Sequence, residues 1–198
     1  MRHLKTRIAC LSILLAGVLA SQTVIADDAK ADEKKDEAKL VKVKARDITL
    51  EIPDTWKQQP PSNRLRLTQF VLPKAEGDGE PTELVISAFP GGGTIEQNLP
   101  RWVGEFDRAG LKVKTTKGTS PQGPYVVGDL TGTHRGSSFA RREKPLENGR
   151  VLTIILMPEG KAYYYLKVTG PDKSVEAVAK TLRTAIGADI EKEEKLEI

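Results

Sequence analysis

The fold of this 198-residue chain is constrained most by short segments of alternating apolar and polar residues, which are bounded by proline and glycine. Residues 48–52 alternate in this way and stop at Pro53, a pattern typical of a strand with one buried face. Residues 64–70 alternate similarly, while residues 84–89 form a more continuous apolar run that predicts a central strand. The same reasoning predicts strands at 111–117, 125–133, 150–157 and 162–169, the last two joined as a hairpin.

Two segments show helical spacing instead. The first carries Ile95, Leu99, Trp102, Val103 and Phe106 on one face. Because of Pro100, two start positions are possible for this helix. The helix begins near Asn98 with the proline in its first turn, which we favour, or it begins at Thr94 with a capping box to Gln97 and a kink. We expect Gly110 to end this helix. The second helix has its apolar stripe at Val175, Val178, Ala179, Leu182 and Ile186.

Runs of strands interrupted by two non-adjacent helices predict an α+β fold. We expect a mainly antiparallel sheet of about six or seven strands and two principal helices. Residues 40–188 are long enough to form one domain with its own core.

The N-terminus has the pattern of a secretory signal peptide. Arg2, Lys5 and Arg7 precede an apolar run at residues 8–20, which is shorter than the roughly 20 residues of a membrane span. We expect cleavage between Ala26 and Asp27, with cleavage after Ala20 as the alternative. The sequence thus predicts a secreted or periplasmic protein with no stable membrane span after cleavage. No cysteine follows the apolar run, so lipid anchoring is not expected.

Loss of the leader simplifies the chemistry of the chain. It lowers the formal net charge from +4 to +1 and removes the only cysteine and one of the two histidines. The remaining charge argues against nucleic-acid binding. Without cysteine there is no disulfide, thiol nucleophile or thiolate metal site. One histidine is a poor basis for zinc, so we expect neither a metal nor a cofactor.

Both ends of the remaining chain are charged. Residues 27–39 contain six acids and four lysines without a large apolar residue, which predicts a flexible tether, with a short helix as the alternative. Residues 189–198 form a charged tail that we expect to be a frayed extension of the last helix.

Three segments together resemble the PsbP-like fold family. They are a strand with a Pro-x-x-Trp exit at residues 48–56, a tryptophan-bearing helix at 98–106, and a strand, Gly-Pro turn and helix at 163–182. The family includes extrinsic subunits of photosystem II, a Ran-binding nuclear-transport factor and uncharacterised secreted bacterial proteins. The resemblance implies an α/β/α sandwich over residues 40–188 and non-catalytic binding or assembly roles. It implies no catalytic residue.

His134 is the only histidine left after processing, so a Ser-His-Asp hydrolase would have to use it. Ser137 and Ser138 lie close in sequence, but the chain has no G-x-S-x-G elbow. We therefore interpret His134 as a polar residue of a loop or strand end and assign no catalytic residue.

Residues 133–150 form the most unusual predicted loop because they are rich in arginine. Arginine side chains bind phosphates, carboxylates and acidic protein faces. The alternative to a binding role is a solvated connection between two strands. No aromatic ladder there supports single-stranded nucleic acid. The candidate ligand- or partner-binding residues are His134, Arg135, Arg141, Arg142, Lys144 and Arg150.

The remaining conspicuous residues have structural explanations. We expect Gly91, Gly92 and Gly93 to make a turn that needs positive φ or close backbone approach, not a phosphate cradle. Trp56, Trp102 and Phe106 are expected in the core. Along residues 163–165, strand alternation sends Tyr164 to the face opposite its two tyrosine neighbours, which leaves one tyrosine face for a partner.

The sequence therefore favours a non-enzymatic binding or assembly module for an envelope protein or a small anionic ligand. Two alternatives stay open: a hydrolase that uses His134 and the arginine-rich loop, and a structural envelope protein.

Overall fold

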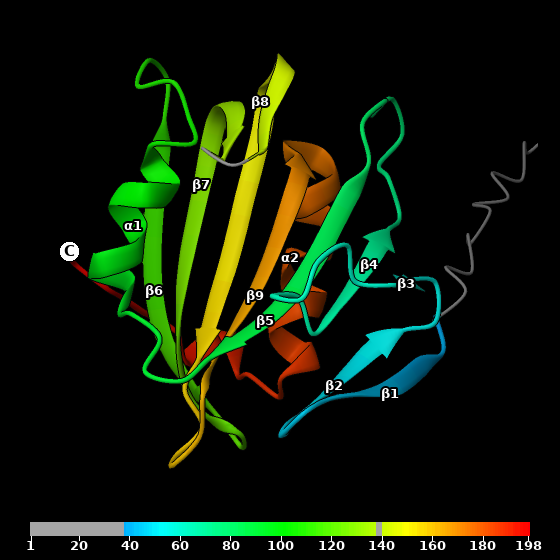
Figure 1. The fold of residues 1–198 in the computed structure, drawn as a ribbon, viewed down its shortest axis with the longest axis vertical. Helices are drawn as coiled ribbons and strands as arrows, with labels where there is room; N and C mark the ends of the chain where they lie inside the picture. The colour runs from blue at the N-terminus through cyan, green and yellow to red at the C-terminus, as the bar shows by residue number, and fades with distance from the viewer. Residues whose placement is uncertain (1–37, 138–139) are drawn as a thin grey trace, which may run out of the picture. The chain divides into compact units, whose positions relative to one another are not determined.

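The computed structural model describes residues 38–137 and 140–198 (Figure 1). The predicted leader, its cleavage site at Ala26 and most of the tether lie outside the described residues, as does Ser138.

The fold is α+β, with two helices packed on an eight-stranded sheet in which every strand pairing is antiparallel. The spatial order is β10-β6-β7-β8-β9-β5-β4-β3. The strands are β3 (Lys57–Gln59), β4 (Thr68–Leu72), β5 (Thr82–Phe89), β6 (Lys112–Ser120), β7 (Gly123–Ser137), β8 (Ala140–Leu156), β9 (Tyr163–Pro171) and β10 (Glu194–Lys195). A separate hairpin consists of β1 (Leu40–Ala45) and β2 (Ile48–Pro53). The sheet exceeds the expected six or seven strands because short β3 and β10 extend its two edges.

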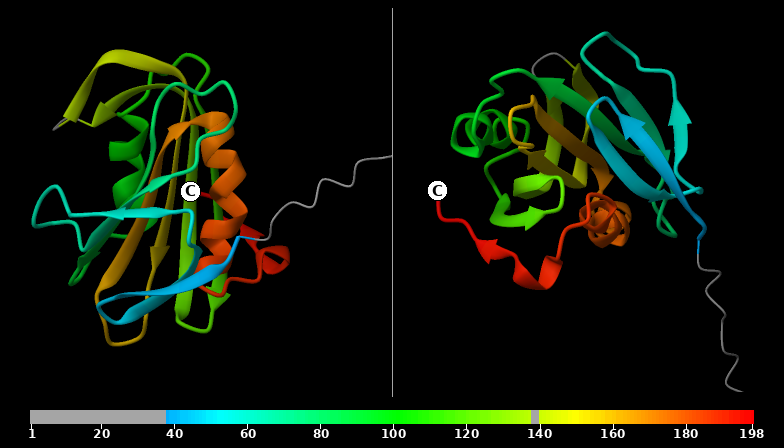
Figure 2. Two further views of the ribbon diagram at one scale, coloured as in Figure 1. Left: turned by 90° about the vertical axis from the view of Figure 1, so that its right-hand side faces the viewer. Right: turned by 90° about the horizontal axis from the view of Figure 1, so that it is seen from below.

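Hydrophobic cores lie on both faces of the sheet, with the two helices on opposite sides (Figure 2). The larger core lies under α2 (Asp172–Ala185) and the β1–β2 hairpin. The smaller core lies under α1 (Ile95–Val103). Strand alternation divides β8 between them: Leu152 and Ile154 face the larger core, while Val151 and Ile155 face the smaller one. Tyr164 likewise enters the larger core and Tyr165 the smaller, which confirms the predicted alternation.

The first helix differs from the favoured prediction at both ends. It begins after Thr94, whose backbone N–H donates to Gln97 Oε1 at 3.0 Å in a capping box, and Pro100 lies inside the helix. The capping box gives the first turn its hydrogen-bond partners, so the earlier start wins despite the proline. The helix ends at Val103 because the following segment bridges to β7, and Gly110 (φ +75°) turns the chain towards β6.

Two further boundaries were predicted wrongly. Residues 64–67 alternate in sequence but lie outside the sheet, which starts with Thr68 paired to Ile86, and Leu65 is 62% exposed. The described residues of the arginine-rich segment are not a loop but continue the β7–β8 ladder, with His134 opposite Leu146. Two register shifts absorb its irregularity, as β-bulges do.

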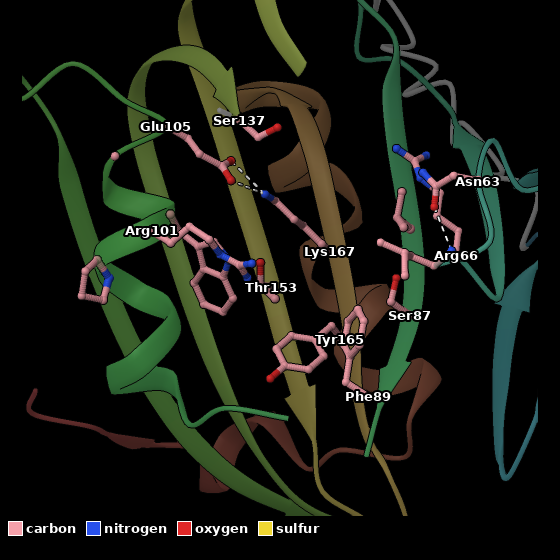
Figure 3. Close-up of a pocket in the computed structure, with 15 residues that line it drawn as sticks. Asn63, Arg66, Ser87, Phe89, Arg101, Glu105, Ser137, Thr153, Tyr165 and Lys167 are labelled. Atoms are coloured by element: carbon pink, nitrogen blue, oxygen red, sulfur yellow. Dashed lines mark hydrogen bonds and ion pairs between the residues drawn. The ribbon is translucent and has the colours of Figure 1, made fainter. Parts of the chain in front are cut away.

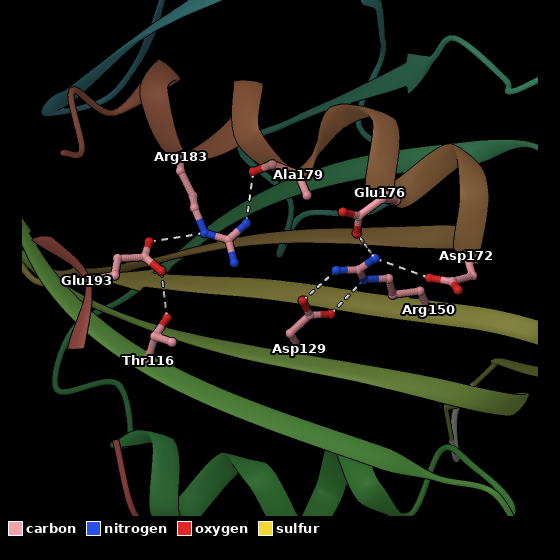
Figure 4. A network of polar contacts seen from close by, with 8 residues as sticks. All are labelled: Thr116, Asp129, Arg150, Asp172, Glu176, Ala179, Arg183 and Glu193. Atoms are coloured by element: carbon pink, nitrogen blue, oxygen red, sulfur yellow. Dashed lines mark hydrogen bonds and ion pairs between the residues drawn. The ribbon is translucent and has the colours of Figure 1, made fainter. Parts of the chain in front are cut away.

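The C-terminal segment is also ordered, contrary to the predicted fraying. A short 3₁₀ helix (Ile190–Lys192) leads into β10, which pairs with β6. The Glu193 carboxylate accepts hydrogen bonds from Thr116, Tyr125 and Arg183 at 2.8 to 3.0 Å (Figure 4 shows two of these). Glu193 thus anchors the C-terminal segment at the β6 edge of the sheet, although it lies in a run of charged residues.

Candidate functional site

A groove of about 490 Å³ lies on the α1 face of the sheet, where α1 stops short of covering β9 and β5 (Figure 3). The end of α1 forms one wall, and the loop before β4 forms the other. Side chains of β5, β8 and β9 form the floor. The lining residues used below are Leu65, Arg66, Ser87, Phe89, Arg101, Trp102, Glu105, Thr153, Tyr165 and Lys167.

Strand alternation places two polar residues on the groove floor. Thr153 lies between Leu152 and Ile154, and both of these face the opposite core. Lys167 is the cross-strand partner of Thr153 in the β8–β9 register. The two polar side chains therefore come side by side at the centre of the sheet.

Glu105 holds the ammonium of Lys167 in place. Its carboxylate is 7% exposed and accepts hydrogen bonds from Lys167 Nζ at 2.8 and 2.9 Å. On its other side Glu105 lies 3.3 Å from Nε2 of His134. Burial raises the pKa of Glu105, but the hydrogen bond with His134 and the charge of Lys167 outweigh it, so the net pKa is lowered. The carboxylate is therefore ionised at neutral pH, and Glu105 with Lys167 forms a neutral pair.

The backbone explains why Glu105 meets His134. Asp107 N–H donates to the carbonyl of Thr133 at 2.9 Å, and Arg135 N–H donates to the carbonyl of Glu105 at 2.7 Å. These bonds fix the chain after α1 alongside β7. The His134 ring also contacts Phe106, with ring centroids 4.9 Å apart, and is 4% exposed. His134 thus supports Glu105 from behind the groove.

The other end of the groove is apolar. Phe89 and Tyr165 pack edge to face with ring centroids 5.6 Å apart, at the end away from Glu105 and Lys167 (Figure 3). Phe89 is 38% exposed and Leu65, on the wall, is 62% exposed. Trp102 is buried, and its ring packs so closely on Gly128 that a Cβ there would lie 3.0 Å from it. Phe89 and Leu65 are thus two large apolar side chains that remain exposed to solvent at the groove.

Two details of the polar lining stand out. The hydroxyl of Thr153 is buried and has no hydrogen-bond partner within the described part of the chain. Arg66 is paired with Glu83 at 2.8 Å, whereas Arg101 donates to the side-chain oxygen of Asn98 at 2.8 Å. Among residues 38–137 and 140–198, no carboxylate lies within 4 Å of the Arg101 guanidinium.

The structure does not gather the six predicted binding residues into one cluster. Arg135 pairs with Asp107, and Arg142 pairs with Glu80 at 3.2 Å. Arg141 and Lys144 are exposed on β8. His134 is buried behind Glu105. A binding role for these residues stays a prediction.

Arg150 lies on the opposite face of the sheet from the groove. Its guanidinium donates to Asp129 at 2.6 and 2.7 Å and to Asp172 at 3.1 Å, and it also contacts Glu176 (Figure 4). Burial lowers the pKa of Arg150, but the hydrogen bonds and charges of its acidic partners outweigh this and raise it. These contacts tie β7, β8 and α2 together.

The groove residues Glu105, Thr153 and Lys167 were missed in the sequence analysis. Thr153 and Lys167 had a recognisable signal, because each is a polar residue within an otherwise apolar strand. Glu105 had no such signal in the sequence, because an acidic residue just after the apolar positions of a helix is usually exposed. Its partners lie 29 and 62 residues away along the chain.

The described residues contain neither a membrane-spanning helix nor a cluster of metal ligands. None of their helices has the length and apolarity needed to cross a membrane. Within the same residues, no group of three or more histidine, cysteine or acidic side chains is placed to hold a metal ion.

No protein-family model and no curated protein matches the chain. Among solved structures, the chain is similar to LpqN, described as involved in cell envelope biogenesis of Mycobacterium tuberculosis. The identity is 14% and the TM-score 0.41, over 83% of this chain and 88% of LpqN. It is also similar to the Saccharomyces cerevisiae Ran-binding protein Mog1p, with 7% identity and a TM-score of 0.44, over 79% of this chain and 95% of Mog1p. Similarity at this level concerns the outline of the fold and not a ligand.

Proposed function

We propose that this chain is a secreted, non-enzymatic binding module that holds a small ligand in the groove between α1 and the loop before β4. The leader pattern of residues 1–26 supports export. The observation that carries the binding role is the buried Thr153 hydroxyl, which lacks a partner within the described residues and lines a groove beside exposed apolar side chains.

Physical chemistry favours an occupant at this place. A buried hydroxyl without a hydrogen bond costs roughly 1–3 kcal/mol, and a ligand can supply the missing partner. A ligand would also cover the apolar surface of Phe89 and Leu65. Concave, mostly apolar sites with a few convergent polar groups are the usual form of small-molecule sites. The hydroxyl oxygen is itself covered, so a neighbouring side chain has to shift before a ligand can contact it.

The groove can be tested with N-phenyl-1-naphthylamine, a neutral apolar dye that fluoresces when it leaves water. We expect saturable binding at one site in the wild-type chain. Ser87→Phe places a ring on the groove floor and should abolish binding. Thr119→Phe, at an exposed position of β6 outside the groove, is the matched control and should bind normally.

A second variant separates loss of binding from loss of folding. Leu65 is exposed on the groove wall, so Leu65→Asp should leave the fold intact by circular dichroism and still weaken dye binding. If the dye does not bind the wild-type chain, or if Ser87→Phe binds it as well as wild type, the groove is not a ligand site. The structural-protein alternative would then be preferred.

The burial of His134 supports the non-enzymatic part of the proposal. A general base must come within hydrogen-bond reach of the proton that it removes. The His134 ring is 4% exposed, its Nε2 faces Glu105, and its Nδ1 is buried. A panel of ester, amide and phosphate substrates should therefore show no turnover above background. Turnover that disappears in a folded His134→Ala variant would support the hydrolase alternative instead.

A further inference from the structure

The charges around the groove are unevenly balanced. Lys167 is neutralised by the buried carboxylate of Glu105, and Arg66 is paired with Glu83. Arg101, on the α1 wall, has a neutral hydrogen-bond partner in Asn98 and no carboxylate within 4 Å among the described residues. Its guanidinium is thus the lining cation whose charge is least compensated.

The inner end of the groove favours a neutral polar group. An ammonium has three donors, and the two oxygens of Glu105 accept hydrogen bonds from Lys167. Among the described residues the third donor of Lys167 has no acceptor, so it remains for a ligand, close to the hydroxyl of its neighbour Thr153. An anion at this point would also face the ionised Glu105 and be repelled by it. A hydroxyl, carbonyl or amine avoids that repulsion.

The α1 wall, in contrast, favours an anionic group. Arg101 is exposed, so an anionic group next to it keeps part of its hydration while it gains a charge-assisted hydrogen bond. The rings of Phe89 and Tyr165, at the end of the groove away from Glu105 and Lys167, offer apolar surface to the rest of the ligand.

We infer that the occupant of the groove is an apolar monoanion, with its charged group at Arg101 and a neutral hydrogen-bonding group towards Lys167 and Thr153. This inference rests on the proposed binding function and assigns the chemical class of its ligand. It also makes Arg101 a specificity-determining residue, although Arg101 lies outside the arginine-rich segment of residues 133–150.

Two dyes with the same apolar skeleton test the inference. N-phenyl-1-naphthylamine is neutral, and 8-anilinonaphthalene-1-sulfonate carries one anionic group on that skeleton. Arg101→Gln should weaken binding of the sulfonate by about fivefold, the size of an exposed ion pair, and should change binding of the neutral dye less than twofold. Sulfonate binding should also weaken with added salt, whereas binding of the neutral dye should not.

Arg108→Gln is the matched control, because Arg108 is exposed just after α1 and does not line the groove. It should leave the affinities for both dyes unchanged. The inference is overturned if Arg101→Gln leaves sulfonate binding unchanged or weakens binding of both dyes equally while Ser87→Phe still blocks them. If neither dye binds the wild-type chain, the proposed binding function itself fails.

Discussion

Among single residues, Glu105 connects the groove to the side chains behind it. Its carboxylate contacts Lys167 in the groove and His134 behind it, and all three come from different segments of the chain. Because the carboxylate is buried, each partner matters more than it would in water. His134, singled out in the sequence as a candidate binding residue, thus contacts Glu105 from the side away from the groove.

Glu105→Gln should lower the free energy of unfolding at pH 7 by about 2 kcal/mol, because it leaves the Lys167 ammonium without its carboxylate. The effect should depend on pH. The pKa of Glu105 is lower in the folded chain than in the unfolded chain, where it is about 4.3. The carboxylate's contribution is therefore fully present above that value and is lost as the pH falls through the folded pKa.

Urea unfolding at pH 7, 5 and 3.5 measures this dependence. The stability difference between wild type and Glu105→Gln should be largest at pH 7 and shrink at pH 3.5. Glu143→Gln, at an exposed position on β8, should match wild type throughout. A Glu105→Gln deficit that is equal at all three pH values would show that the carboxylate's charge is not what stabilises the pair.

Thr153→Val should have opposite effects on stability and binding. Valine has nearly the shape of threonine and lacks the buried hydroxyl, so the empty protein should gain about 1 kcal/mol in urea unfolding. Binding of N-phenyl-1-naphthylamine, whose N–H can donate to the hydroxyl, should weaken. Thr119→Val on the exposed surface of β6 is the control. A loss of stability in Thr153→Val would mean that the hydroxyl already has a partner.

At the scale of elements, short edge strands and terminal segments complete the sheet. The segment after α2 brings Glu193 to the side chains of Thr116, Tyr125 and Arg183, although its sequence is a run of charges. Burial and the charge of Glu193 both raise the pKa of Tyr125. The segment is therefore part of the fold and not a solvated extension.

Deletion of residues 189–198 should reduce the free energy of unfolding by about 3 kcal/mol, because it leaves the Arg183 guanidinium buried without its carboxylate. Deletion of residues 197–198 alone removes an exposed ion pair with Lys195 and should change stability by less than about 0.5 kcal/mol. Urea unfolding compares the two. Equal stabilities would contradict the docking of this segment.

Some elements were predictable from the sequence because their patterns are local. Alternation placed β2, β5 and β9 correctly, and the stripe from Val175 to Ile186 placed α2. The start of α1 depended on a competition between a capping box and Pro100, which a local pattern does not decide. Residues 64–67 alternate like a strand, but pairing with β5 begins only at Thr68, the first residue of β4.

At the scale of the whole molecule, the site depends on contacts between distant segments. The α+β class follows from the order of strands and helices. The groove exists because α1 ends at Val103 and leaves β9 and β5 uncovered on that face. Neither the helix end nor the pairing of Glu105 with Lys167 is encoded in a short window, so neither could be predicted from spacing. The arginine-rich segment was conspicuous for its composition, while the groove residues are scattered.

The position of a bound ligand shows directly whether the groove is a binding site. Backbone amide chemical shifts, recorded as 8-anilinonaphthalene-1-sulfonate is added to ¹⁵N-labelled protein, report which residues change environment. We expect the largest shifts on Ser87, Arg101, Glu105, Thr153 and Lys167, with α2 and the β1–β2 hairpin unaffected. Shifts concentrated on the arginine-rich segment of β7 and β8, or on the α2 face, would contradict this expectation.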